Sequence, residues 1–344
     1  MSEMGARVAP KLVAMVLAIA LLLAGAGCGE KSESSSGTVK PHSLDLALDW
    51  FPNPDHVALY EAIHEGYFDD VGLKVSPHVP SDPAAPIKQV AAGRVDLAIS
   101  YEPEVLLARD RGLPVVAVAA MIQRPLTSLI AIGRKHVDRP GDLRGKRVGT
   151  AGIPYQSAYL HTILARAHVP RDSVKETNVG ASLLPAMLSG KVDATLGGFW
   201  NVEGIELRQR HTRPTIIPVD RLGVPDYDEL VLVANADKLD DRKDDLRLFI
   251  GALAKGARQA RRDPRSATSA LLDQNRDLKK KLTSASVRAT LPTLFPEQAD
   301  RPWGYLDPAK WRNYGGWMRD NGLLENLPDV PSAITNDLLP GQGL

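Results

Sequence analysis

The segment DWFPNPDH at residues 49–56 carries side chains that can bind a ligand, in a place where a simple turn would suffice. The apolar residues 44–48 before it predict a buried strand, and the residues after it predict a helix. A turn between these elements needs only small residues such as Gly, Ser or Asp. Here Trp50 offers a flat surface for stacking, while Asn53 and His56 offer hydrogen-bond donors and acceptors. We therefore expect this loop to face a ligand.

Each of these residues also has a structural alternative. Trp50 could pack between two parts of the fold, and Asn53 or His56 could cap the helix that follows. Asp55 is the stronger candidate for the cap, because carboxylates are favoured at that position.

Three further segments combine aromatic, amide and carboxylate side chains, and each follows or adjoins a predicted strand. An aromatic ring, an amide and a carboxylate close together suit a heteroaromatic ring with exocyclic N–H groups. The structural alternatives are a solvent-exposed helix start before Pro103 and a solvated first-turn carboxylate at Glu203. The candidates are Tyr101 and Glu102 in SYEPE (100–104), Tyr155 in AGIPYQS (151–157), and Trp200, Asn201 and Glu203 in FWNVE (199–203).

An internal repeat shows which elements position these loops. AAGRVDLAIS (91–100) and LSGKVDATLGG (188–198) both predict a helix end, a glycine at the C′ position, and then a Val-Asp pair leading into a short strand. The chain is thus predicted to hold two similar α/β halves with parallel sheets, in which ligands bind beyond the carboxyl ends of the strands.

The C-terminal third predicts a returning strand and a series of helices. The strand lies within 226–239, and helices are expected at 243–262, 264–282 and 284–291. Trp311, Tyr314 and Trp317 follow helical spacing and are expected to be core residues.

The N-terminus has the layout of a signal peptide. Arg7 and Lys11 precede an apolar run that ends in small residues before Cys28, the only cysteine. LLLAGAGC resembles a bacterial lipobox, with Gly25 where Leu or Val is usual. We expect Cys28 to be lipidated, which would anchor the exported protein to the membrane; the alternative is ordinary cleavage near Ala26.

Composition excludes other classes of protein. The chain has 344 residues, 44% hydrophobic and 24% charged, with a formal net charge of +1. This is a soluble globular composition without a basic face, so nucleic acid is not an expected partner. No nucleophile-elbow, zincin or Walker motif is present and the eight histidines lack metal spacing, so no catalytic residue, metal or cofactor is predicted.

DWFPNPDH together with FWNVEGIEL resembles the family of solute-binding proteins for thiamine pyrimidine precursors, and DLRGKRVG (142–149) resembles the wider group that also binds sulfonates, nitrate and riboflavin. The resemblance covers about residues 44–325. It implies a two-lobed type II periplasmic-binding-protein fold with a ligand cleft between the lobes, and delivery of the ligand to the permease and ATPase subunits of an ABC importer. The site it implies consists of Trp50, Asn53 and His56 in one lobe, Tyr155, Trp200, Asn201 and Glu203 in the other, and Tyr101 and Glu102 on the hinge side.

The resemblance also implies a domain plan and a ligand. A 4-amino-2-methylpyrimidine precursor of thiamine is expected; a riboflavin-like heterocycle or a sulfonate remains as an alternative. The fungal pyrimidine-precursor synthases share the fold, but their active lysine and cysteine-rich segment have no counterpart in the four loops, so an enzyme is not expected. The expected parts are a signal peptide (1–27), a tether (28–43), the first part of lobe 1 (44–131), lobe 2 (132–228) and the return to lobe 1 with the C-terminal helices (229–344).

Overall fold

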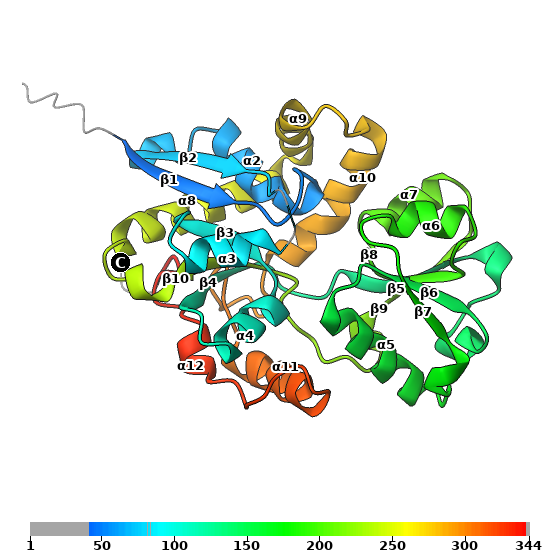
Figure 1. Ribbon diagram of the computed structural model, residues 1–344. Helices are drawn as coiled ribbons and strands as arrows, with labels where there is room; N and C mark the ends of the chain where they lie inside the picture. Colours follow the sequence, from blue (N-terminus) through cyan, green and yellow to red (C-terminus); the bar gives the residue numbers. More distant parts are fainter. Residues whose placement is uncertain (1–40, 81, 83, 342–344) are drawn as a thin grey trace, which may run out of the picture. The chain divides into compact units, whose positions relative to one another are not determined.

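The computed structural model describes residues 41–80, 82 and 84–341, so the predicted signal peptide and Cys28 lie outside the described residues. Two five-stranded sheets organise this part of the chain (Figure 1). The first strand begins at His42, so its first two residues belong to the segment 28–43 that was expected to be a tether. The first sheet has the order β2-β1-β3-β10-β4, with strands β1 His42–Ala47, β2 Leu73–His78, β3 Leu97–Ser100, β4 Val115–Ile122 and β10 Leu230–Asn235.

The second sheet has the order β7-β6-β8-β5-β9 and is drawn in green shades in Figure 1. Its strands are β5 Thr127–Ile132, β6 Arg147–Thr150, β7 Lys175–Asn178, β8 Ala194–Phe199 and β9 Pro214–Pro218.

Both sheets are mixed, so the prediction of parallel sheets holds for only part of each sheet. Strand β10 runs antiparallel to β3 and β4, and β5 runs antiparallel to β8 and β9. These two strands enter their sheets directly from a crossing between the sheets, without the helical crossover that a parallel neighbour requires. Because β5 belongs to the second sheet, the first crossing lies at 123–126, a few residues before the expected boundary at 131. The second crossing lies at 223–229, between η6 (Val219–Leu222) and β10.

Helices pack against both sheets, and the long helix α8 lies against α2 beside the first sheet. No helix among the described residues is long and apolar enough to cross a membrane. The helices are α2 Val57–His64, α3 Ala85–Ala91, α4 Glu102–Asp110, α5 Pro154–Arg166, α6 Leu183–Leu188, α7 Glu203–Gln209, α8 Lys243–Arg262, α9 Pro264–Gln274, α10 Lys280–Thr290, α11 Pro308–Asp320 and α12 Val330–Ala333, and the 3-10 turn η1 spans Pro54–His56.

The helix predicted over 264–282 is divided at Asn275. Its backbone is extended there (φ −140°, ψ 99°), and its side chain donates from Nδ2 to the carbonyl of Pro52 at 2.8 Å. Its Oδ1 also accepts from the N–H of Asp277. This local turn ends α9 and fixes the helical segment against the loop after β1, a tertiary contact that the helical pattern does not reveal.

The repeated Gly-basic-Val-Asp pattern has one structural role in both halves. The carboxylate of Asp96 accepts from the backbone N–H of Asp45 in β1 at 2.9 Å, and that of Asp193 accepts from the N–H of Arg147 in β6 at 3.0 Å. Gly93 and Gly190 lie just beyond the ends of α3 and α6 with φ of 64° and 81°, as a C′ glycine requires. The repeat therefore sets equivalent strands, and hence equivalent loops, in the two sheets.

The core follows the alternation of strand side chains. Leu230 and Leu232 of β10 face the side of the first sheet that is covered by α2 and α8, while Val231 and Val233 face the other side. The second core cluster continues into the helices of the second sheet through aromatic residues of α11. Trp311 and Tyr314 are fully buried there and Trp317 is partly buried, which confirms the prediction that the α11 stripe is core.

Candidate functional site

Asp49, two residues after the end of β1, joins two loops of the first sheet. One carboxylate oxygen accepts from Nε2 of His56 at 2.7 Å, and the other accepts from the hydroxyl of Tyr101 at 2.7 Å. Because Tyr101 follows β3, this buried carboxylate holds the carboxyl ends of β1 and β3 together. The sequence analysis did not select Asp49; its only signal was a charged residue directly after an apolar strand.

His56 is buried, and both of its ring nitrogens have hydrogen-bond partners. The backbone N–H of Asn53 donates to Nδ1 at 3.3 Å, so the ring is an acceptor at Nδ1 and carries its hydrogen on Nε2, toward Asp49. His56 thus stiffens the loop from inside.

Asn53, not Asp55, caps the turn that follows. Its Oδ1 accepts from the N–H of Asp55 at 2.8 Å, and its Nδ2 donates to the carbonyl of Phe51. The expectation that Asp55 is the cap is therefore wrong, because the Asp55 side chain is drawn into a buried contact with another part of the chain. Half of the hydrogen-bonding capacity of Asn53 is used within the loop.

Trp50 and its neighbour Phe51 are the exposed aromatic side chains of this loop, and Phe51 is the more exposed of the two. Trp50 is 37% exposed, and its ring meets that of Phe51 edge to face at 6.0 Å between centroids. Burial between packed elements, the structural alternative for Trp50, does not describe this position.

The two carboxylates next to β3 differ in burial and in contacts: Glu102 is fully buried, whereas Glu104 is partly buried. Glu102, at the first position of α4, accepts from the backbone N–H of Asp228 in the second crossing at 2.7 Å. Burial, and then the nearby charge of Asp228, raise the pKa of Glu102 well above its usual range. Asp228 in turn pairs with Lys310 and accepts from the indole N–H of Trp311. Glu102 therefore ties α4 to the second crossing.

Glu104 is a second carboxylate that the sequence analysis missed. It accepts from the hydroxyl of Ser100 at 2.7 Å, and burial raises its pKa to about 7, with the Asp49 charge acting in the same direction. The only signal for Glu104 in the sequence was its position in SYEPE (100–104).

The second sheet contributes Tyr155 and the turn after β8. Tyr155 is buried at the start of α5 and packs on Tyr159 with 5.6 Å between ring centroids. Trp200 donates from its indole N–H to the carbonyl of Pro125 in the first crossing at 3.1 Å. Glu203, the first residue of α7, accepts from the backbone N–H of Phe199 at 2.7 Å, and burial raises its pKa.

Asn201 connects the two sheets' loops directly. Its Nδ2 donates to Oδ1 of Asp55 and to the hydroxyl oxygen of Thr290, each at 2.6 Å, and its side chain is fully buried. Burial raises the pKa of Asp55 to about 7, although the hydrogen bond from Asn201 lowers it. Negative charges of Asp49 and Glu203 act on the same carboxyl.

The strand ends of both sheets therefore converge on one acidic, aromatic region. The charges acting on Asp55 come from both sheets, and the Tyr155 hydroxyl lies in the field of Glu104, Glu229 and Asp49. Carboxylates of this kind accept hydrogen bonds from ring-bound N–H groups and pair with cationic nitrogens. Of the nine predicted site residues, Trp50, Tyr101, Tyr155, Trp200 and Glu203 lie in this region. The other four, Asn53, His56, Glu102 and Asn201, form hydrogen bonds within the protein, although one side-chain oxygen of Glu102 and that of Asn201 have no partner.

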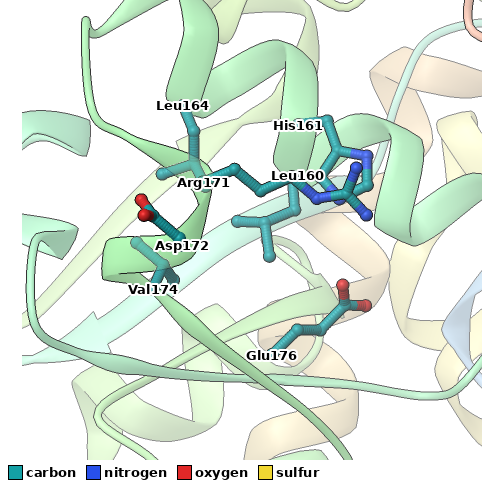
Figure 2. Close-up of a pocket in the computed structure, with 7 residues that line it drawn as sticks. All are labelled: Leu160, His161, Leu164, Arg171, Asp172, Val174 and Glu176. Atoms are coloured by element: carbon teal, nitrogen blue, oxygen red, sulfur yellow. The ribbon is translucent and has the colours of Figure 1, made fainter.

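A hollow of about 490 Å³ lies elsewhere, between α5 and the edge strand β7 of the second sheet (Figure 2). Leu160, Leu164 and Val174 give it apolar walls, and Arg171 lies toward His161 in Figure 2. Burial, and then the charge of Arg171, lower the pKa of His161. None of the predicted site residues lines this hollow.

The fold is that of the type II periplasmic binding proteins. The chain superposes on the periplasmic aliphatic sulphonate binding protein of Escherichia coli with a TM-score of 0.68 and 13% identity, covering 87% of this chain and 99% of that one. Residues 53–267 match the family described as NMT1/THI5 like, and the chain belongs to this family.

Curated relatives give a finer comparison. The chain is 33% identical over 332 residues to the formylaminopyrimidine-binding protein of Halalkalibacterium halodurans, covering 95% of this chain and 99% of the relative. It is 23% identical over 310 residues to the 4-amino-5-hydroxymethyl-2-methylpyrimidine phosphate synthase THI13 of Saccharomyces cerevisiae, covering 86% and 87%. A binding protein is thus a nearer relative than this synthase.

Proposed function

We propose that this protein is the extracytoplasmic substrate-binding protein of an ABC importer and that its ligand is a 4-amino-2-methylpyrimidine precursor of thiamine. The observation that carries the proposal is the group of carboxylates at the strand ends. The charges of Asp49 and Glu203 act on the Asp55 carboxyl there, and the exposed Trp50 follows Asp49 in the chain. An aminopyrimidine offers a flat ring for Trp50 and N–H donors for carboxylate oxygens. The relative named for formylaminopyrimidine binding supports the same ligand class.

A sulfonate is a poorer match to these residues. An anion would need N–H or O–H donors at the start of α5, but the backbone N–H of Ala151 already donates to Oε1 of Gln156 at 2.8 Å. The hydroxyl of Ser157 donates to Glu176 at 2.6 Å. These donors are committed, and the nearby carboxylates would repel a sulfonate.

A synthase role is also a poorer match. The loops that carry the candidate residues, at 49–56, 100–104, 151–157 and 199–203, contain no lysine to hold an aldehyde cofactor. The proposal is therefore a binding protein without catalysis, exported and held at the membrane through Cys28.

Calorimetry with three compounds tests the ligand. We expect 4-amino-2-methylpyrimidine to bind more tightly than 2-methylpyrimidine, which lacks the exocyclic amine, and ethanesulfonate not to bind. Native mass spectrometry of the purified protein would show the mass of any co-purified ligand. Tighter binding of the sulfonate, or equal binding of the two pyrimidines, would refute the proposed ligand class.

A further inference from the structure

The side chain of Asn201 spans between elements attached to different sheets. It lies in the turn between β8 and α7, whereas Asp55 lies in η1 after β1 and Thr290 ends α10. Both N–H groups of its amide are used, one toward Asp55 and one toward Thr290, at 2.6 Å each. One amide thus holds two residues that lie 146 and 89 positions away from it in the sequence.

The acceptors are arranged to receive these two hydrogens. The hydroxyl of Thr290 donates to the carbonyl of Ser286 at 2.9 Å, which leaves its oxygen free to accept from Asn201. Asp55 is fully buried, and hydrogen bonds to a buried carboxylate are among the stronger ones in proteins. Helix α10 packs against both η1 and α7, so the contact lies within a continuous interface.

The surroundings make Asp55 dependent on Asn201. Apart from Asn201, the groups that act on the Asp55 carboxyl are His56, which favours its ionised form, and the negatively charged Asp49 and Glu203, which oppose it. With burial also opposing ionisation, the amide of Asn201 is the largest favourable influence on this carboxylate. Loss of the amide would leave a buried carboxylate beside two others.

We propose that Asn201 and Asp55 form a latch that holds the second lobe against the first, with Asn201 acting as a positioning residue and not as a ligand contact. The latch stabilises the arrangement in which Trp50 and Glu203 face the same ligand. The latch rests on the proposed function only for its effect on ligand affinity. Its effect on the compactness of the unliganded protein does not depend on that function.

Small-angle scattering of the unliganded protein at pH 8 tests the latch directly. Asn201→Asp places a second carboxylate against Asp55 and should increase the radius of gyration. The reciprocal double variant Asp55→Asn/Asn201→Asp restores one amide and one carboxylate, and it should return the radius to the parent value. Asp55→Asn alone keeps an acceptor oxygen and should remain compact. Asn326→Asp, at an exposed position, adds the same charge and serves as the matched control.

Affinity separates a latch from a ligand contact. A latch changes the population of the closed form, so Asn201→Asp should weaken 4-amino-2-methylpyrimidine and 2-methylpyrimidine by the same factor, about tenfold or more. An unchanged radius in Asn201→Asp, failure of the double variant to restore it in a folded protein, or a changed ratio of the two affinities would each overturn the latch. If the parent binds neither pyrimidine, the proposed function fails, and the scattering result still decides the latch.

Discussion

The hydroxyl of Tyr101 donates to the buried carboxylate of Asp49 at 2.7 Å, across 52 positions of sequence. This bond joins the loop after β3 to the loop after β1, and the same carboxylate holds His56. The floor of the candidate site in the first sheet is therefore a single hydrogen-bonded unit.

Removal of this hydroxyl should destabilise the protein. Tyr101→Phe leaves one oxygen of Asp49 without its donor, which costs about 1–3 kcal/mol of unfolding free energy. Urea denaturation measures this cost. Tyr305→Phe, which removes a hydroxyl from a partly buried ring, is the control and should change little. Equal stability of Tyr101→Phe and the parent would show that the Asp49 bond contributes nothing.

Trp50→Ala should weaken every flat ligand without unfolding the protein. The ring is 37% exposed, so its removal creates no core cavity, while stacking area is lost for pyrimidines with and without the amine. Calorimetry and thermal melting measure the two effects. Leu327→Ala, at a side chain that is 61% exposed, is the control for loss of surface apolar area. Undiminished binding by Trp50→Ala would exclude Trp50 as the stacking surface.

Glu203→Gln should act selectively on ligands that carry an exocyclic amine. Glutamine keeps an acceptor for the N–H of Phe199 but removes the charge. The affinity for 4-amino-2-methylpyrimidine should therefore fall by the contribution of one hydrogen bond to a charged group, about 10- to 150-fold. The affinity for 2-methylpyrimidine should be nearly constant. Glu206→Gln on the same helix removes a carboxylate that pairs with Arg210, and it should leave both affinities unchanged. A Glu203→Gln variant that binds the amine as well as the parent does would contradict the assignment.

Glu104 should make stability depend on pH. Its pKa is about 7 in the folded protein against 4.5 for the free group, so the folded state binds the extra proton between these values. Stability contributed by this group is therefore lost as pH rises from about 4.5 to about 7, by on the order of 3 kcal/mol. Glu104→Gln should melt higher than the parent at pH 8 and close to it at pH 5. Glu65→Gln, at an exposed position, should show no such pH dependence. A difference of the same size at both pH values would exclude titration of Glu104 as its cause.

Cys28→Ser tests the proposed anchor. The variant should leave the membrane fraction of the expressing cells and should lose incorporation of labelled palmitate, because serine cannot form the thioether to the lipid. Equal membrane retention of variant and parent would instead favour ordinary cleavage near Ala26.

The sequence alone determined the features that depend on local pattern. The Val-Asp pair after a C′ glycine identified two equivalent helix-to-strand units. The loops at 49–56 and 199–203 were correctly placed at the ends of strands, because apolar runs and turn residues are local signals. The α11 stripe of Trp311 and Tyr314 was likewise visible in its helical spacing.

Only the tertiary structure decided which polar side chains are exposed and which are buried against each other. Asp49 meets Tyr101 and Asp55 meets Asn201 across 52 and 146 positions, and such pairings follow from strand order and sheet placement. For the same reason the hydrogen bonds that Asn201 forms with Asp55 and Thr290, and that Glu102 forms with Asp228, could not be predicted. The charges of Asp49 and Glu104 on the Tyr155 hydroxyl could not be predicted either. The sequence does not show whether a carboxylate is solvated or buried. Burial arises only when distant segments pack together, and it sets both the partners and the pKa of the carboxylate.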